Sequence, residues 1–119
     1  MNDQSKTVDL RALGEELLTD AAMQGALRAA HTLPHPVDGL RQTVIALIGG
    51  QDLAEHESPG PAALLVLRGA VRLVAGEEEI ALGELQMAPI PNRRHSLHAD
   101  EDSVVVLSVS VPQRAPAAD

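Results

Sequence analysis

The first part of the chain carries apolar residues at helical spacing. Four of them lie three or four residues apart: Leu10, Leu13, Leu17 and Ala21. This spacing predicts one amphipathic helix over about residues 8–22, with Asp9 as its N-cap. The apolar face of such a helix has to be buried, and we expect it to lie on the outside of a sheet.

Beyond the helix, glycine and proline divide the chain into short runs rich in Val, Leu and Ile. The runs that predict strands are residues 41–48, 63–68, 70–75, 78–82 and 103–111. Residues 26–33 fit either an extension of the helix or a first strand, and Pro34 and Pro36 after them favour the strand. Several short strands separated by such turns are typical of an all-β sandwich or barrel.

These elements predict a single domain over residues 8–111, with its barrel over about residues 26–111. We expect a disordered polar start over residues 1–7 and a flexible tail over residues 112–119. The length of 119 residues suffices for one domain with a core of its own.

Two groups of residue types are missing from the composition, and their absence excludes several kinds of functional site. The chain has no Cys, which excludes disulfides, thiolate metal sites and cysteine nucleophiles. It has no Phe, Tyr or Trp, which excludes stacking of bases or sugars on aromatic side chains. The barrel core must therefore consist of Leu, Val, Ile and Ala, and we expect such packing to leave room for a modest pocket.

The chain is acidic, with a net charge of −8 from 17 acidic and 9 basic residues. Such a chain repels phosphate backbones and anionic lipids, so we expect neither a nucleic acid nor a membrane partner. The first residues show no apolar stretch of the kind found in signal peptides, which favours a cytoplasmic protein.

Two of the five histidines are the strongest candidates for chemistry. His56 and His95 each follow a glycine-containing turn and lie close to strand-like residues. Histidines from different strands can converge inside a small barrel, because alternate side chains of a strand point inward. Neutral imidazoles at such a barrel mouth can hold a divalent metal ion.

With these residues in place, the chain resembles a small single-domain cupin of the RmlC-like superfamily, whose fold is the double-stranded β-helix or jelly roll. The first cupin motif is matched by Gly50, His56 after five residues, and a closing Gly69. The second motif is matched by Gly83, Pro89 and His95. The resemblance covers about residues 41–111 and implies an all-β jelly-roll barrel with one N-terminal α-helix.

The metal-binding positions of the cupin motifs are only partly kept. The family's site holds a divalent ion with three His and one Glu, and this sequence keeps His56 and His95 of that set. Ser58 stands at the second His position, and Ala62 stands at the Glu position. Three protein ligands are the usual minimum for a catalytic metal ion, so a third ligand would have to come from elsewhere.

Three classes of function remain open. We favour a binding module that holds a small anionic ligand in the barrel mouth, without full metal-dependent catalysis. The residues expected to contact this ligand are His56, His95, Ser58 and Arg94.

The first alternative is a metal-dependent enzyme of the oxygenase or isomerase type. His56 and His95 would then be ligands of Fe²⁺, Mn²⁺, Ni²⁺ or Zn²⁺. A metal-free enzyme that uses one of these histidines as a general base is a variant of this alternative. The second alternative is a structural or interaction module with a vestigial pocket.

The remaining expectations concern residues outside the motifs. His98 lies three residues beyond the second-motif histidine, so on a regular strand it points to the opposite face. We expect His31 and His35 to lie in loops, and Met23 and Met87 to fill the core. The resemblance also implies a homodimer, and covering an exposed strand edge gives a physical reason for one.

Overall fold

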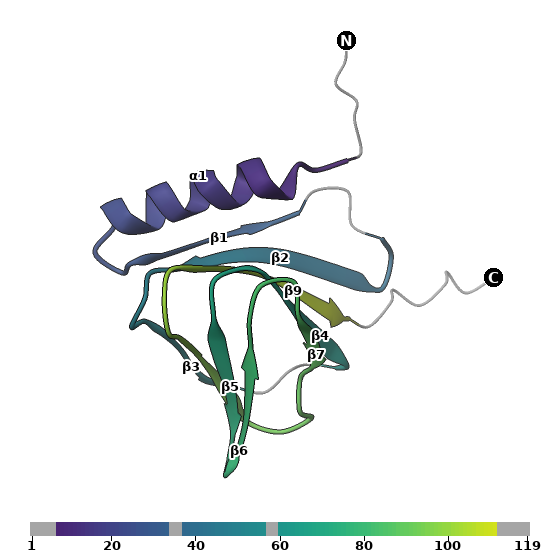
Figure 1. Cartoon of the computed structure of the whole chain (residues 1–119). Coiled ribbons are helices and arrows are strands. Elements are labelled where there is room, and N and C mark those ends of the chain that lie inside the picture. Colours follow the sequence, from purple (N-terminus) through teal and green to yellow (C-terminus); the bar gives the residue numbers. More distant parts are fainter. Residues whose placement is uncertain (1–6, 34–36, 57–59, 112–119) are drawn as a thin grey trace, which may run out of the picture.

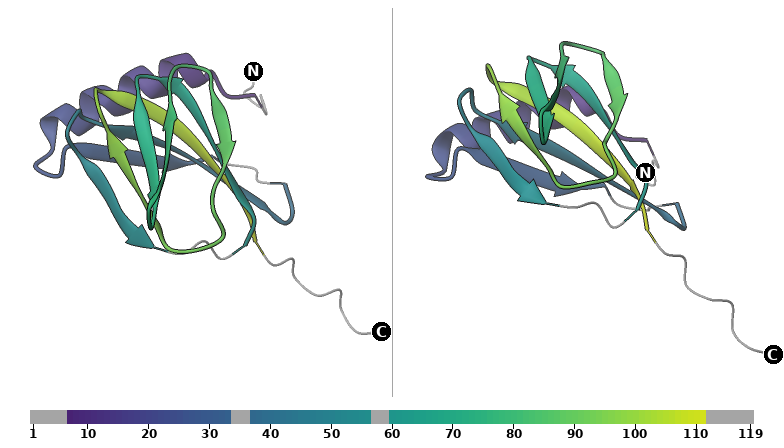
Figure 2. Two further views of the ribbon diagram at one scale, coloured as in Figure 1. Left: turned by 60° about the horizontal axis from the view of Figure 1, so that its bottom comes forward. Right: turned by 90° about the horizontal axis from the view of Figure 1, so that it is seen from below.

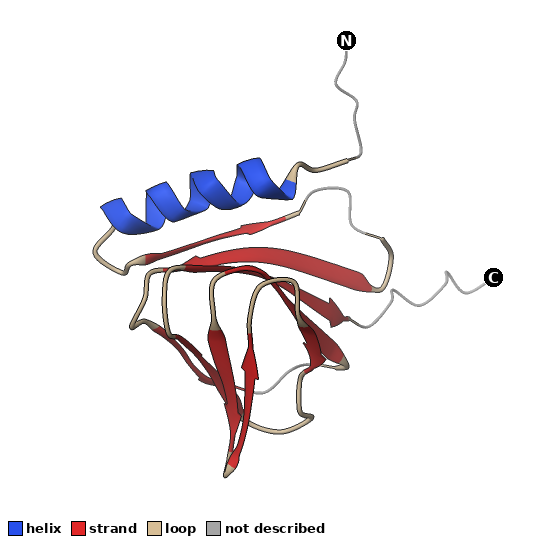
Figure 3. Ribbon diagram, in the orientation of Figure 1, coloured by secondary structure: helices blue, strands red, loops and turns tan. Residues whose placement is uncertain are grey.

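The computed structural model describes residues 7–33, 37–56 and 60–111, with the backbone alone of residues 55 and 56. In these ranges it contains one helix and nine strands (Figures 1 and 3). The elements are α1 (Leu10–Met23), β1 (Arg28–Thr32), β2 (Leu40–Leu47), β3 (Asp52–His56), β4 (Ala62–Arg68), β5 (Val71–Ala75), β6 (Glu78–Leu82), β7 (Met87–Pro89), β8 (His95–Ala99) and β9 (Ser103–Ser110). The predicted tail over residues 112–119, and the predicted polar start except for Thr7, lie outside the described residues.

Helix α1 forms close to its predicted bounds, with the predicted cap. The Asp9 carboxylate accepts a hydrogen bond from the backbone N–H of Ala12 at 3.1 Å, which satisfies one of the free donors of the first turn. The helix lies along β1 and β2, on the outside of a sheet as expected (Figure 1). A Cβ on Gly14 would lie 3.1 Å from Val104 Cγ1, so this glycine allows the helix to approach β9 closely.

The strands form two antiparallel sheets, one of five strands in the order β1-β2-β9-β4-β7 and one of four in the order β3-β8-β5-β6. The four-stranded sheet stands against one face of the five-stranded sheet, and α1 covers part of the other face (Figures 1 and 2). The chain passes repeatedly from one sheet to the other, which is the arrangement of a jelly roll. The predicted fold class, an all-β jelly roll with one N-terminal helix, is confirmed.

The five apolar runs predicted as strands all form strands, and the ambiguous segment at residues 26–33 contains β1. Three further strands, β3, β7 and β8, lie outside the predicted runs. They are short and mix polar and apolar residues, so their own sequences do not show a strand pattern. Hydrogen bonding to neighbouring strands stabilises them instead.

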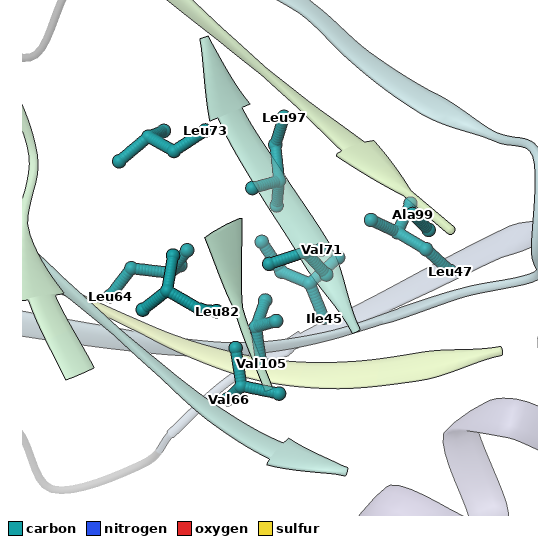
Figure 4. Packing of buried hydrophobic residues seen from close by; sticks show 10 residues of the cluster. All are labelled: Ile45, Leu47, Leu64, Val66, Val71, Leu73, Leu82, Leu97, Ala99 and Val105. Carbon is teal, nitrogen blue, oxygen red and sulfur yellow. The ribbon is translucent and has the colours of Figure 1, made fainter. Parts of the chain in front are cut away.

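The barrel interior is packed with aliphatic side chains from both sheets. Ten of them form one buried cluster (Figure 4): Ile45, Leu47, Leu64, Val66, Val71, Leu73, Leu82, Leu97, Ala99 and Val105. A second cluster fills the layer under α1 and includes Leu17, Ala21, Val44, Val104 and Val106. Strand β9 therefore has both of its faces buried, one in each cluster, and it is the central strand of the five-stranded sheet.

The expectation that Met23 and Met87 fill the core is wrong. Met23 is 80% exposed because it is the last residue of α1, and Met87 is 64% exposed. Met87 lies on the edge strand β7, whereas the helix packs on β1, β2 and β9. One helix is too narrow to cover all five strands, so the outer face near β7 stays open.

Within the part of the chain that the structure describes, no helix is both long and apolar enough to cross a membrane.

The turn between β4 and β5 depends on a glycine in the left-handed region. Gly69 has a φ of +97°, and a Cβ there would lie 2.3 Å from Ser103 Oγ and 2.5 Å from the carbonyl oxygen of Asp102. Ser103 cannot move away easily, because it is buried and its Oγ accepts a hydrogen bond from the Ala70 N–H at 3.1 Å. The same hydroxyl lies 2.7 Å from the Glu101 carbonyl, to which it donates.

Replacement of this glycine should therefore destabilise the domain. We expect Gly69→Ala to lower the free energy of unfolding by about 3 kcal/mol, from the cost of a left-handed alanine and of overlap with Ser103. Gly25→Ala is the control, since no atom lies within 4 Å of its added Cβ, and its effect should stay below about 0.5 kcal/mol. Denaturant unfolding measures both, and equal stability of Gly69→Ala and the wild type would contradict the expectation.

Candidate functional site

His95 opens strand β8 and turns a fixed ring into the barrel. It is only 2% exposed, and its Nδ1 lies 2.8 Å from the backbone carbonyl oxygen of Arg93. A carbonyl oxygen only accepts, so Nδ1 carries the hydrogen and donates it. In the neutral ring Nε2 then carries the lone pair, which makes this atom a hydrogen-bond acceptor or a base.

The segment before His95 is fixed by a tight bend and by an ion pair on the outer surface of the barrel. The Arg93 N–H donates to the Pro91 carbonyl at 2.8 Å, which makes a tight bend before the strand. The Arg93 guanidinium lies 2.8 Å from the Glu78 carboxylate on β6. Arg93 thus points to the surface, whereas Arg94, next to His95 in the chain, is exposed at the rim of the barrel.

The pocket at this end of the barrel is much smaller than expected. His95 lines a cavity of ≈ 20 Å³ together with seven aliphatic side chains, among them Leu64, Leu73 and Ile90. Leu64, Leu73 and Leu97, which Figure 4 shows in the buried cluster, also line this cavity. Such a volume holds about one water molecule, so any larger ligand has to bind at the mouth and not in the interior.

The two motif histidines are brought together by strand pairing. His56 is the last residue of β3, and it lies directly opposite His95 in the antiparallel pairing of β3 with β8. The register is irregular between Leu53 and His56. The side chain of His56 and all of Ser58 and His35 lie outside the described residues, so their predicted places in the site stay predictions.

The described side chains do not form a metal site by themselves. Among the residues whose side chains are described, no three His, Asp or Glu side chains lie close enough together to share one. The second-motif histidine is the one described imidazole at the mouth, and a catalytic metal ion usually has three protein ligands. Metal ligation by His56 and His95 therefore stays a prediction, as does the divalent ion itself.

Arg41 is a residue of the mouth that sequence reasoning missed. Alternate residues of β2 face the interior, and Arg41 stands on the same side as Ile45 and Leu47. Strand β9 lies between β2 and β4, and its Val109 is paired with Arg41 on one side and with Ala62 on the other. Arg41 and Ala62 therefore lie at the same level of the sheet. Arg41 is exposed and makes no ion pair with a described residue. The position of Arg41 follows from the strand register, which cannot be determined from the neighbouring residues in the sequence.

Ala62 in turn accepts a hydrogen bond from the N–H of Ile90, which lines the same cavity as His95. Arg41 thus belongs to the same end of the barrel as Arg94. Two exposed guanidinium groups at the end of the barrel that holds a buried imidazole are suited to bind a small anion, because a planar guanidinium matches a carboxylate.

His98 lies on the outer face of β8, as its spacing from His95 predicts. Its Nδ1 contacts the Asp52 carboxylate of β3, and its Nε2 lies 3.6 Å from the Asp100 carboxylate. Asp100 also accepts a hydrogen bond from Arg72 Nε at 3.0 Å and forms an ion pair with Arg72 Nη2 at 2.9 Å. These charged side chains form a surface row across the four-stranded sheet, outside the mouth. His31, expected in a loop, is exposed on strand β1.

No protein-family model matches the sequence, and no curated protein matches it either. The structure is similar to that of a conserved protein of unknown function from Streptococcus pyogenes, with 27% identity and a TM-score of 0.74 over 95% of this chain and 93% of that chain. It is similar to a cupin superfamily protein from Desulfitobacterium hafniense DCB-2, with 15% identity and a TM-score of 0.65 over 71% and 78% of the two chains. A cupin-2 domain containing protein from Shewanella frigidimarina NCIMB 400 matches with 14% identity and a TM-score of 0.68 over 90% and 97%.

The chain has the cupin fold. The similarity to the two named cupins extends over most of each chain, and it confirms the fold that the two sequence motifs indicated. A fold does not by itself determine an activity, so the function of this domain depends on its own side chains.

The surface row includes a pH-dependent interaction between Asp100 and Arg72. The hydrogen bond from Arg72 holds the pKa of Asp100 below its ordinary value of 3.8, and the same hydrogen bond raises the pKa of Arg72 further. A carboxyl group whose pKa is lower in the folded state stabilises the fold above its ordinary pKa. This contribution is lost as the pH falls through the lowered value.

Removal of the Asp100 charge should therefore destabilise the fold at neutral pH and have no effect on stability in acid. We expect Asp100→Asn to lower the melting temperature at pH 7, and the difference from the wild type to close as the pH falls below about 4. Thermal unfolding between pH 7 and pH 2 measures this. Glu77→Gln is the control, since Glu77 makes no ion pair with a described residue. A difference for Asp100→Asn that is constant across this range would contradict the assignment.

Proposed function

We propose that this cupin domain binds a small hydroxylated carboxylate at the mouth of its barrel, without a tightly held metal ion. The observation that supports this most is the hydrogen bond from His95 Nδ1 to the Arg93 carbonyl. This hydrogen bond places a hydrogen on Nδ1, so that Nε2 is an acceptor whenever the ring is neutral, and a ligand that binds there would offer a donor such as a hydroxyl group.

The exposed arginines at the mouth indicate the charge of the ligand. Arg94 is adjacent to His95 in the chain, and Arg41 lies at the same end of the barrel. The chain as a whole has a net charge of −8, so an anion gains affinity only where cations are locally concentrated. The carboxylate would pair with Arg94, while the hydroxyl group would donate to His95 Nε2.

The size of the ligand follows from the packing. The cavity beside His95 measures ≈ 20 Å³, so only the hydroxyl end of a ligand would reach the ring. The rest of the molecule would lie over the rim, in contact with solvent. Binding of this kind is shallow, and we expect dissociation constants in the millimolar range.

A thermal-shift series tests this proposal with matched pairs of acids. Lactate and malate should raise the melting temperature more than propionate and succinate, which lack the hydroxyl group. A ligand at ten times its dissociation constant adds about 1.4 kcal/mol, which corresponds to about 5 °C for a domain of this size. Arg94→Gln and His95→Gln should abolish the difference between the paired acids.

Arg28→Gln is the control variant, since Arg28 is exposed at the other end of the five-stranded sheet, opposite Leu47. It should respond to lactate as the wild type does. Equal shifts for lactate and propionate, or an effect of lactate that survives in His95→Gln, would contradict the proposal. The absence of any shift would favour the interaction module.

One observation favours a metal-dependent enzyme as the second candidate, namely that His56 and His95 lie directly opposite each other. Metal analysis decides between the two. After incubation of untagged protein with Fe²⁺, Mn²⁺, Ni²⁺ or Zn²⁺ and desalting, we expect well below one equivalent, because two imidazoles bind weakly.

Three variants locate any metal ion that remains bound. Loss of a stoichiometric ion in both His56→Ala and His95→Ala would establish the metal centre and overturn the metal-free proposal. Loss in His98→Ala alone would place the ion on the outer face, beside Asp52 and Asp100, and would leave the proposal intact.

A further inference from the structure

A pair of threonine hydroxyl groups lies on the inner face of the five-stranded sheet, close to the barrel mouth. Thr43 of β2 is half-buried, and its Oγ1 lies 3.3 Å from Oγ1 of Thr32, its partner on β1. Side chains two residues apart on a strand share a face, so Thr43 stands between Arg41 at the rim and Ile45 in the interior. The inner face of β2 therefore changes from aliphatic to hydroxyl to guanidinium toward the mouth.

The neighbours of Thr43 place it beside the cavity that the imidazole lines. Ile45 follows it on the inner face of β2, and Leu107 is its partner on β9. Both residues line the cavity of ≈ 20 Å³ together with His95. Strands β2 and β8 belong to different sheets, so a ligand seated over this cavity has the histidine on one side and Thr43 with Arg41 on the other.

The hydroxyl pair has one hydrogen left for a ligand. Two hydroxyl groups carry two hydrogens, and the bond between them uses one. Neither threonine makes another side-chain hydrogen bond with a described residue. Thr32 is exposed to water, whereas Thr43 is half-buried. When Thr32 donates to Thr43, the Thr43 hydroxyl can donate to an anionic oxygen atom, and such charge-assisted hydrogen bonds are stronger than neutral ones.

Arg41 and Thr43 thus offer a second anion-binding position, on the side of the mouth opposite β8. The carboxylate nearest to the ligand's hydroxyl group is already assigned to Arg94, which precedes β8 in the chain. Packed sheets lie about 10 Å apart, and the side chains of both sheets shorten this gap. Lactate carries its hydroxyl group and its carboxylate on the same carbon atom, so it is too short to contact both sides.

We propose that the mouth selects dicarboxylates, with Arg41 and Thr43 as the residues that bind the second carboxylate. This rests on the proposed binding of a carboxylate at the mouth and narrows the ligand to a four-carbon hydroxy dicarboxylate such as malate. The hydroxyl group and the first carboxylate bind on the β8 side, to His95 and Arg94. The second carboxylate, one CH₂ group further along the ligand, pairs with Arg41 and accepts a hydrogen bond from Thr43.

Titrations with four acids separate the contribution of the second carboxylate from that of the hydroxyl group. Malate, succinate, lactate and propionate combine two carboxylates or one with the presence or absence of the hydroxyl group. Thermal-shift titrations of the full chain at about pH 7.5 and constant ionic strength give the dissociation constants, without a difference in screening between the acids. The wild type should bind malate about tenfold more tightly than lactate, and succinate about tenfold more tightly than propionate.

Three variants assign this preference to its residues. Arg41→Gln and Thr43→Val should each reduce it to about threefold or less, and valine keeps the shape of threonine without its hydroxyl group. Thr43→Ser keeps the hydroxyl group and should keep the preference. The matched controls are Arg28→Gln, at the other end of the sheet, and Thr19→Val, on the exposed side of α1, where the hydroxyl donates to the Glu15 carbonyl. Both controls should bind the four acids as the wild type does.

A wild type that binds the dicarboxylates no more tightly than the monocarboxylates would overturn the inference. So would a preference that persists unchanged in both Arg41→Gln and Thr43→Val. Equal binding of malate and succinate, and of lactate and propionate, would contradict only the contact with His95. A preference for two carboxylates that is lost in Arg41→Gln would then still support the second anion-binding position. Failure of all four acids to bind would overturn both proposals.

Discussion

The interior of this barrel has to be filled without a single aromatic ring. Leu, Val and Ile side chains from both sheets fill it together (Figure 4). The cavity that they line with His95 measures ≈ 20 Å³. The central strand β9 contributes to both layers, since Val105 packs in the interior while Val104 and Val106 pack under α1. Because small branched side chains pack this closely, little empty volume is left between them.

This packing decides where chemistry can take place. A large cavity would allow a ligand to be enclosed, whereas the closed interior confines contacts to the rim and to the outer surfaces. His95 and Ser103 are the buried polar residues of the described chain, and the Nδ1 of His95 donates a hydrogen bond to the Arg93 carbonyl. In the described part of the chain, no buried side-chain nitrogen or oxygen atom lacks a hydrogen-bond partner. The buried imidazole is therefore compatible with a stable core.

The parts of the fold that follow local patterns were predictable from the sequence. The helix, its Asp9 cap and the longer apolar strands form where spacing and turn residues indicate, because each is specified by neighbouring residues. The placing of Met87 was not predictable, since its exposure depends on how far a single helix reaches across five strands. The row formed by Arg72, His98 and Asp100 depends on strand register, which no local pattern carries.

The site was predictable to a smaller extent than the fold. The two motifs singled out His56 and His95, and the register places these residues opposite each other. The small volume of the cavity that His95 lines with described residues was not predictable, because composition gives the volume of the side chains but not the distance between the sheets. Arg41 escaped it too, since its nearness to the mouth requires the pairing of β2 with β9 and of β9 with β4.

His95 should keep one tautomer, with the hydrogen on Nδ1 and Nε2 as the acceptor atom. Long-range proton–nitrogen NMR of the histidine rings tests it most directly, with the His95 signals assigned by comparison with His95→Gln. The spectra are taken at pH 9, where an ordinary imidazole is neutral. The hydrogen bond to the Arg93 carbonyl predicts a protonated Nδ1 and a lone pair on Nε2. A ring protonated on Nε2, or one that exchanges freely between the two tautomers as in water, would contradict it.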